Sequence, residues 1–250
     1  MRQPKVAGMF YEENKEKLIK QIENCYNYKL GPGKITENKE NTITGIVAPH
    51  AGYFYSGPCA AHAYKALAES QKPELIILLG TNHTNIEGNS ILTQDYQTPL
   101  GTAKVDTEFC QKLKQNTQIQ ENQEQQNQEH SIKTQIPFLQ HIYKDNFKIV
   151  PIIIDHASDY KQISAAIANT IQETNKKTTI IASSDFTHYG INYGYGYVPF
   201  TDNIQQKMYK LDAVAIKHIT NLDTEKFIEY VQKKGATICG ATAIATMSHY

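Results

Sequence analysis

The segment Leu75-Ile-Ile-Leu-Leu-Gly80-Thr-Asn-His83-Thr sets the fold class of this 250-residue chain. It opens with an unbroken apolar run, as expected of a strand that is buried on both faces of a sheet. Two further segments repeat the pattern of an apolar run that ends beside a histidine or a carboxylate: Gly45-Ile-Val-Ala-Pro-His50 and Thr179-Ile-Ile-Ala-Ser-Ser-Asp185-Phe-Thr-His188. Loops at the carboxyl ends of parallel strands converge on one crevice. The three segments therefore predict a shared rim of an active site or metal site.

Helix-like segments alternate with the strand-like runs. A helix is expected to begin near Ser56, which can cap it, with Pro58 in its first turn. Another is expected at 130–143, where Pro137 kinks it or shifts its first turn. The other expected elements are strands at 43–48, 147–154 and 178–182, and helices at 158–174, 202–219, 223–233 and from 239 to about 249. This alternation predicts an α/β fold with three layers, α/β/α, and a mostly parallel central sheet.

The stretch 115–128 consists almost entirely of Gln, Asn and Glu, with hardly an apolar side chain to bury. Such polar tracts are typical of exposed loops. The tract does not mark a domain boundary, because the strands on its two sides have the same character. The sequence shows no internal repeat, and its length suits one large α/β unit. Residues 1–250 are therefore expected to form a single domain.

Charge and hydropathy exclude several classes of function. The 25 basic residues equal the 25 acidic ones, so composition gives no support for binding to nucleic acid or to an anionic membrane. No apolar stretch approaches the ~20 residues of a membrane span. The segment 1–10 lacks the apolar region of a signal peptide. We therefore expect a cytoplasmic protein.

The four cysteines show no paired spacing, which argues against a disulfide framework and against a zinc ribbon. Cys25, Cys59 and Cys110 fall in helix-like segments and are expected to be small buried thiols. Cys239 instead begins a predicted helix, where unpaired N–H groups and the helix dipole favour the thiolate. It is a candidate metal ligand or nucleophile. The alternative is that Cys239-Gly240 simply lets a helix begin under a close-packed loop.

Three polar residues are candidates for acid–base or supporting roles. Asp185 and His188 lie three positions apart in one loop, where a carboxylate can orient an imidazole. Alternatively, Asp185 caps a helix and His188 lies at the surface. His130 follows the polar tract at the start of an amphipathic helix, and is either a general base or a capping-region residue.

Six ordered blocks that span nearly the whole chain resemble the Memo family, whose prokaryotic members are called AmmeMemoRadiSam system protein B. The blocks are Pro4-Lys-Val-Ala-Gly-Met-Phe-Tyr11, Ala48-Pro-His-Ala-Gly-Tyr-Phe-Tyr-Ser-Gly57, Leu79-Gly-Thr-Asn-His83-Thr, Glu129-His130-Ser-Ile-Lys-Thr-Gln-Ile-Pro-Phe-Leu139, Ser183-Ser-Asp185-Phe-Thr-His188-Tyr-Gly190 and Ile238-Cys239-Gly240. The resemblance implies a fold similar to the LigB-type class III extradiol dioxygenases. By the same resemblance, a functional link to a radical SAM protein is expected.

The resemblance also implies a metal site, with His50, His83 and Cys239 as the ligands. Non-heme iron oxygenases use two histidines and one carboxylate, and here a thiolate takes the carboxylate's place. Two imidazoles and a thiolate can bind iron, copper or zinc, so the residues themselves do not choose among these metals. Iron or copper is expected, and zinc stays open.

The resemblance places His130, Asp185 and His188 in the same pocket, where they are the candidate catalytic residues. The expected function is redox chemistry at the metal, on a small molecule or a peptide. One alternative is a peptide-binding or scaffolding protein that uses the same pocket, with aromatic contacts from Tyr53, Phe54, Tyr55 and the tyrosine-rich segment 189–197. Another alternative is a metal-assisted hydrolase, which needs an open coordination position and a general base.

Members of the family continue beyond the Cys239-Gly240 helix into further strands, whereas this sequence ends at Ser248-His249-Tyr250. We expect either a naturally short chain or a truncated one. In both cases one edge of the sheet and one wall of the pocket would differ from the family's pattern.

Overall fold

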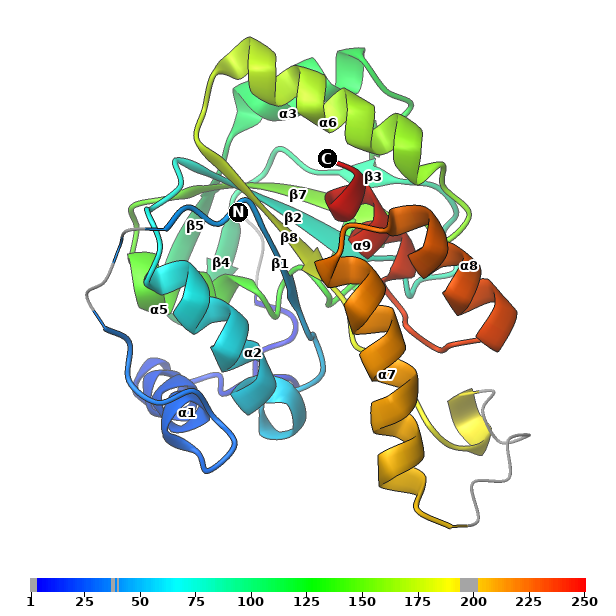
Figure 1. The fold of residues 1–250 in the computed structure, drawn as a ribbon. Coiled ribbons are helices and arrows are strands. Elements are labelled where there is room, and N and C mark those ends of the chain that lie inside the picture. Colours follow the sequence, from blue (N-terminus) through cyan, green and yellow to red (C-terminus); the bar gives the residue numbers. More distant parts are fainter. Residues whose placement is uncertain (1–3, 37–38, 40, 194–201) are drawn as a thin grey trace.

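The computed structural model describes residues 4–36, 39, 41–193 and 202–250 (Figure 1). Its centre is a sheet with the strand order β1-β8-β2-β7-β3-β6. The strands that position the candidate site are neighbours in this sheet: β1 (Gly45–Ala48), β8 (Thr178–Ser183), β2 (Leu75–Thr81) and β7 (Lys148–Ile154). Each of these neighbouring pairs is parallel. The predicted mostly parallel sheet is confirmed.

Beyond β7 the sheet becomes mixed. The short β3 (Ser90–Ile91) is antiparallel to β7 and parallel to β6 (Gln120–Glu121). The start of β7 also pairs with β5 (Gly101–Val105), which is joined to β4 (Tyr96–Thr98) in an antiparallel hairpin. These strands extend the sheet on the side away from β1.

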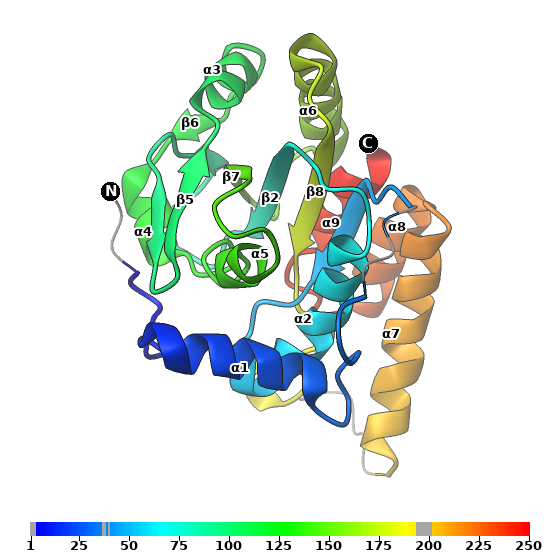
Figure 2. The ribbon, with the colours of Figure 1, turned by 90° about the vertical axis from the view of Figure 1, so that its left-hand side faces the viewer.

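Helices cover both faces of the sheet, which confirms the three-layer α/β/α fold (Figures 1 and 2). One face carries three helices that contact one another: α1 (Lys15–Asn27), α2 (Tyr53–Ala68) and α5 (Ile136–Tyr143). The other face carries a connected series: α3 (Thr107–Gln115), α6 (Tyr160–Thr174), α9 (Ala241–His249), α8 (Thr224–Lys234) and α7 (Ile204–Thr220). Two short elements complete the described chain, α4 (Gln123–Gln128) beside β3 and the 3-10 turn η1 (Ile191–Tyr193).

The core is built on β2, in which every residue from Leu75 to Thr81 is buried. Six of the seven residues of β7 are buried beside it. Burial of each large aliphatic side chain contributes roughly 1.5–3 kcal/mol relative to exposure, so the central strands are held firmly. The loops that follow them are therefore presented at fixed positions. In the described part of the chain no helix combines the length and the apolar character needed to cross a membrane.

Two helices begin three or more residues from the predicted position. The first helix after β1 begins at Tyr53 rather than near Ser56, since the backbone N–H of Ser56 already donates to the carbonyl of Gly52 at 3.1 Å. The Tyr53 side chain is buried, and its hydroxyl donates to the carbonyl of Thr134 at 2.6 Å. Ser56 instead donates its hydroxyl to the carbonyl of Ala51. Pro58 consequently lies inside the helix. The helix expected at 130–143 begins only at Ile136, with Pro137 in its first turn, so the shift of the first turn is observed.

The polar tract 115–128 is not an exposed loop, which corrects the prediction from composition. It includes β6 and α4, and the side chains of Gln125 and Gln126 are buried. The amide of Gln125 donates to the carbonyls of Ile86 and Gly88, and that of Gln126 donates to the carbonyl of Ser90. Amide groups can be buried where they meet backbone carbonyls. Composition cannot reveal such partners, because they lie elsewhere in the chain.

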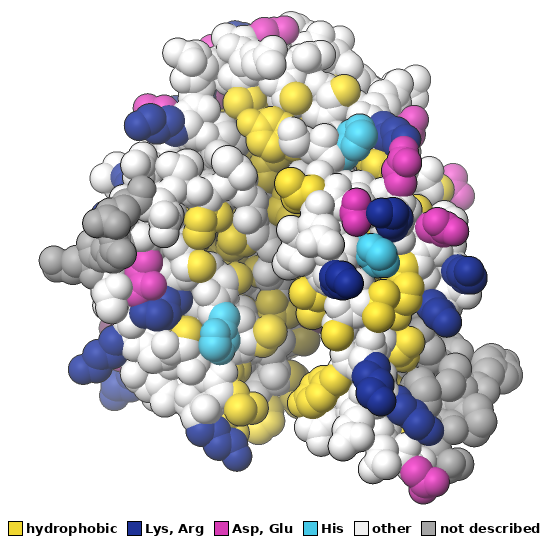
Figure 3. Space-filling model, in the orientation of Figure 1, with side chains coloured by type: hydrophobic (Ala, Val, Ile, Leu, Met, Phe, Trp, Pro, Cys, Tyr) yellow, Lys and Arg dark blue, Asp and Glu magenta, His cyan; other side chains and the backbone are white. Residues whose placement is uncertain are grey.

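An apolar groove of about 620 Å³ runs along β1, which in the described residues pairs only with β8. Its walls come from β1, α7 and α9, and include Ile46, Ile216 and Met247. Figure 3 shows apolar side chains gathered in the hollow between α2 and α7. Cys59 also lines the groove and is exposed, so the prediction of a buried thiol is wrong there, whereas Cys25 and Cys110 are buried as predicted.

Candidate metal site

Three loops that follow neighbouring parallel strands meet at one edge of the sheet. His50 follows the end of β1, His83 follows β2, and Asp185 follows β8. Because β1, β8 and β2 are adjacent and parallel, their carboxyl ends lie side by side. The structure places these three residues at the same edge, as the apolar runs predict. Cys239 reaches this edge from the turn that precedes α9.

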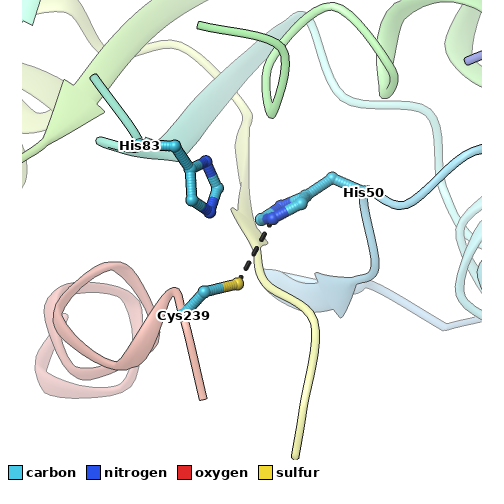
Figure 4. Close-up of side chains that lie close together, drawn as sticks. All are labelled: His50, His83 and Cys239. Atoms are coloured by element: carbon cyan, nitrogen blue, oxygen red, sulfur yellow. Dashed lines mark hydrogen bonds between the residues drawn. The ribbon is translucent and has the colours of Figure 1, made fainter. Parts of the chain in front are cut away.

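The side chains of His50, His83 and Cys239 point toward one another (Figure 4). One donor atom from each lies within 4.8 Å of the other two. The shortest described contact joins Nε2 of His50 to Sγ of Cys239 at 3.2 Å. Metal bonds of roughly 2.0 to 2.3 Å predict separations of about 4 Å between ligand atoms. The observed limit of 4.8 Å is slightly wider, and it is far below the ~8 Å at which Cys239 could not share a metal ion with the two histidines.

The hydroxyl of Ser183 determines which nitrogen of His50 faces the cluster. This hydroxyl donates its single proton to the carbonyl of Ser131 at 2.8 Å and accepts a hydrogen bond from the amide of Gln135 at 2.7 Å. It lies 2.9 Å from Nδ1 of His50, so Nδ1–H must be the donor in that contact. Nε2 is then the nitrogen that faces Cys239, and the hydrogen bond between Nε2 and the sulfur requires a proton on one of the two atoms. The side chain is buried, which holds this orientation.

Glu129 determines which nitrogen of His83 faces the cluster, as Ser183 does for His50. Oε1 of Glu129 lies 3.1 Å from Nδ1 of His83, and Oε2 accepts the backbone N–H of His83 at 2.6 Å. A carboxylate oxygen can only accept, so Nδ1 carries a proton and Nε2 is left for the cluster. Burial lowers the pKa of His83, but hydrogen bonds with Cys239 and Glu129 raise it more, to about 10. Metal binding at Nε2 would therefore release a proton.

Cys239 is held by contacts with the loop after β8. Its sulfur accepts the backbone N–H of Asp185 at 3.3 Å, and the next residue, Gly240, donates its N–H to the hydroxyl of Ser184 at 2.9 Å. A side chain at Gly240 would place Cβ 2.5 Å from Cβ of Ser184, so only glycine permits this approach.

The Cys239 thiol is acidic for another reason than the sequence predicts. Burial raises its pKa, but hydrogen bonds with His50 and His83 lower it more, to about 5. The helix begins only at Ala241, and the N–H on the sulfur belongs to Asp185. The thiolate thus depends on the two imidazoles rather than on a helix end.

His130 lies beside the cluster, as the resemblance implies. Its ring stacks on His83 with 4.8 Å between ring centroids, and on its other side it stacks on Phe10 at 4.5 Å. It also meets the ring of His50 edge-on at 5.3 Å. Burial lowers the pKa of His130, and although Glu129 opposes this effect the pKa falls to about 4. The ring is therefore neutral at pH 7, and it is a weaker base than an ordinary imidazole.

Asp185 organises the loop that carries His50. Its Oδ1 accepts the backbone N–H groups of His50 at 2.8 Å and of Ala51 at 3.3 Å. Its Oδ2 lies 3.9 Å from Nε2 of His50. Asp185 does not cap a helix, so the capping alternative for this residue is not observed.

His188 contacts the loop segment that leads to Cys239. Its backbone N–H donates to the hydroxyl of Thr237 at 2.8 Å, and its Nδ1 donates to the Thr237 carbonyl at 2.8 Å. The ring contacts Tyr193. In the described residues His188 does not join the donor set of His50, His83 and Cys239.

Two supporting residues escape the analysis of the sequence, Glu129 and Ser183. Both appear in blocks that resemble the family, but no local pattern marks them as partners of His83 and His50. The only signal is position, since Glu129 directly precedes His130 and Ser183 ends a strand. Of the predicted aromatic contacts, Tyr53 is buried, Phe54 and Tyr55 are exposed, and the tyrosines at 195 and 197 lie outside the described residues.

Comparison with known proteins gives one consistent result. Residues 2–250 match the family described as Memo-like protein. A MEMO1 family protein of Methanopyrus kandleri is 38% identical over 247 residues, which cover 96% of this chain and 82% of that protein. One of Nitrosopumilus maritimus is 38% identical over 253 residues, covering 99% and 86%. One of Methanobrevibacter smithii is 34% identical over 255 residues, covering 98% and 86%. The resemblance seen in the sequence motifs is confirmed.

Proposed function

This chain belongs to the Memo-like family, and from that premise we propose that it binds iron or copper through His50, His83 and Cys239 at a redox-type site. The observation that carries the proposal is the approach of two imidazole nitrogens and one sulfur, from three separate loops, to within 4.8 Å of one another. The parallel strands that end at these loops are consistent with the LigB-type dioxygenase fold that the family resemblance implies. Such an arrangement leaves coordination positions open for a substrate or dioxygen.

The donor set fits a transition metal of intermediate or soft character. Thiolate and imidazole suit iron, copper and zinc, whereas magnesium and calcium prefer oxygen ligands. Each histidine is tied through Nδ1, His50 to Ser183 and His83 to Glu129, and each faces the cluster with Nε2. Hydrogen bonds of this kind behind a ligand imidazole are typical of metal sites in proteins.

The proposed chemistry divides between the metal and the protein. A bound iron or copper ion would supply electron transfer or activation of dioxygen. His130 is the residue best placed to accept a proton from a substrate, because it is neutral and stacks directly on His83. Asp185 holds the His50 loop and touches Cys239 through its backbone. The substrate class we propose is a small molecule or a peptide.

A second candidate function is peptide binding with the metal in a regulatory role. It is favoured by two aromatic side chains just after His50: Phe54 is 85% exposed and Tyr55 is 82% exposed. The two rings meet edge-on with 5.3 Å between centroids, so they form one exposed apolar surface in the first turn of α2. Exposed aromatic residues of this kind are frequent anchors of protein interfaces.

Metal titration of a matched pair of variants tests the site. Cys239→Ser removes the soft donor and keeps nearly the same volume, so affinity for iron, copper and zinc should fall while folding changes little. The control is Cys59→Ser, the same change at an exposed thiol outside the donor set, and it should bind like the wild type. If Cys239→Ser binds all three metals as tightly as the wild type, the two-histidine, one-cysteine site is wrong.

Dioxygen uptake separates the redox function from its competitors. The protein is purified without air, loaded with iron or copper, and then exposed to dioxygen and a reductant. Uptake that depends on His130 supports the redox function. Tight metal binding without dioxygen uptake would support the metal site and contradict the redox function. A peptide library tests the competing function. Peptide binding that is lost in the Phe54→Ala, Tyr55→Ala double variant would favour the peptide function.

A further inference from the structure

A buried carboxylate that is not one of the three proposed ligands lies directly behind the cluster. The side chain of Glu129 is only 1% exposed. It reaches the site from the C-terminal end of α4 (Gln123–Gln128), far in sequence from the strands that carry the ligands. A buried carboxylate is costly unless its oxygens are fully engaged, so its contacts indicate what it holds in place.

The contacts of Glu129 are concentrated on the histidines. Oε1 accepts hydrogen bonds from the backbone N–H groups of His130 and Ser131, both at 2.7 Å, and lies 3.1 Å from Nδ1 of His83. The same oxygen is 3.3 Å from Nδ1 of His130. Oε2 accepts the backbone N–H of His83 at 2.6 Å. One carboxylate therefore binds both the backbone and the ring of His83, and both the backbone and the edge of His130.

This shared partner explains how the two rings are arranged. His83 and His130 are stacked with an interplanar angle of 21° and 4.8 Å between centroids. Both present Nδ1 to Oε1 of Glu129, so the opposite edge of each ring points away from the carboxylate. For His83 that edge carries Nε2, the nitrogen that faces Cys239.

We propose that Glu129 is a positioning residue that fixes His83 as an Nε2 donor and holds His130 parallel beside it. The inference rests on the proposed function, because it assigns Glu129 to the support of the same metal site. Glu129 does not belong to the donor set of His50, His83 and Cys239, and its oxygens are engaged in hydrogen bonds, three at Oε1 and one at Oε2. A single side chain thus links the proposed ligand to the imidazole stacked beside it.

The variant Glu129→Gln tests this role with Co²⁺ as the probe. The amide keeps the shape of the side chain, but its NH₂ group would face N–H donors on one side. We expect Co²⁺ affinity to fall about 10- to 100-fold, the usual loss when the partner of a ligand histidine is removed. The visible absorption of the bound Co²⁺ should also shift, because the orientation of His83 relative to the ion changes.

Asp106→Asn is the matched control. Asp106 is equally buried, with a side chain 3% exposed, and it accepts from Lys176 and from the backbone N–H of Phe109, away from the donor set. This variant should lose stability without changing the affinity or the spectrum of Co²⁺. Equal effects of the two variants on Co²⁺ binding would overturn the inference, because both would then reflect a loss of stability.

A second measurement needs no variant and so survives a failure of Glu129→Gln to fold. In the zinc-loaded wild type, ¹⁵N NMR of the histidine rings should show a proton on Nδ1 of His83 and the metal at Nε2. The opposite assignment would overturn the role of Glu129 while leaving a metal site in place. If the wild type binds none of Co²⁺, Zn²⁺, iron and copper, the proposed function fails instead. If the wild type binds Co²⁺ and Glu129→Gln matches it in affinity and spectrum, the inference about Glu129 alone is wrong.

Discussion

Ser183 Oγ and His50 Nδ1 lie 2.9 Å apart, and the other two partners of the hydroxyl determine the direction of their hydrogen bond. The proton of Ser183 is committed to the carbonyl of Ser131, so the imidazole must donate. A serine that ends a buried strand thus selects the nitrogen that the neighbouring loop offers to the cluster.

Replacement of Ser183 by alanine tests this selection. Ser183→Ala removes the acceptor of Nδ1–H of His50 and of one N–H of the Gln135 amide, whose nitrogen still donates to the carbonyl of Pro49, so we expect the free energy of unfolding to fall by about 1–3 kcal/mol. Metal affinity should fall about tenfold or more, because the ring loses its support. Calorimetric metal titration and chemical unfolding measure the two effects. Ser70→Ala, at a buried hydroxyl that donates to the carbonyl of Leu67, should lower stability and leave metal affinity unchanged.

Gly240 allows the turn before α9 to approach β8 closely. In Gly240→Ala the new Cβ would lie 2.5 Å from Cβ of Ser184 and 2.7 Å from the carbonyl oxygen of Ser183, so the turn must move and carry Cys239 with it. We expect a stability loss of about 1–3 kcal/mol together with weaker metal binding. The control Gly52→Ala meets no atom closer than 3.5 Å and should affect neither property strongly. Wild-type metal affinity in Gly240→Ala would contradict this account of the turn.

His188 should prove separable from the ligands. An asparagine side chain can still donate to the carbonyl of Thr237, which is the main contact of the ring. We therefore expect His188→Asn to bind metal within about tenfold of the wild type, and to slow turnover where that imidazole transfers protons. Parallel titrations and rate measurements check both points. An affinity loss as large as that of Cys239→Ser would instead make His188 a ligand.

Asp106 makes the stability of the protein depend on pH at the edge opposite the site. Burial raises the pKa of this carboxyl, but the hydrogen bonds from Lys176 and from the N–H of Phe109 lower it more, so the folded pKa lies below the ordinary value. Its contribution to stability is therefore full above pH ~3.9, the ordinary pKa, and is lost as the pH falls through the folded pKa.

Unfolding of wild type and Asp106→Asn over the acid range measures this contribution. The variant should be less stable by about 1–3 kcal/mol at pH 7. The difference between the two proteins should shrink as the pH falls below about 4. A difference that stays constant down to pH ~2 would show that the charge of Asp106 contributes nothing.

The parts of the site that could be predicted are those that a short segment carries by itself. An apolar run such as Leu75–Leu79 predicts its own burial, and the residues just beyond such runs lie at strand ends, which locates His50, His83 and Asp185. Cys239 is different, because its local sequence fits a structural thiol as well as a metal ligand or nucleophile. Its place in the donor set follows from the resemblance to a family.

What escaped prediction depends on partners distant in sequence. Glu129 contacts His83 across 46 positions, and Ser183 contacts His50 across 133. The burial of Gln125 likewise depends on carbonyls of Ile86 and Gly88. A polar side chain shows no local periodicity that identifies its partner, so only the folded chain reveals these contacts.

The contact between His50 and Cys239 joins residues that are 189 positions apart. A metal bound to both would act as a cross-link that closes a loop comprising most of the chain. Closing a loop of that length removes conformational entropy from the unfolded chain equivalent to about 5 kcal/mol in the simplest polymer treatment. The ion would then connect the loop after β1 to the turn before α9. Its removal would lower the stability of the whole fold, including parts that lie far from the metal site.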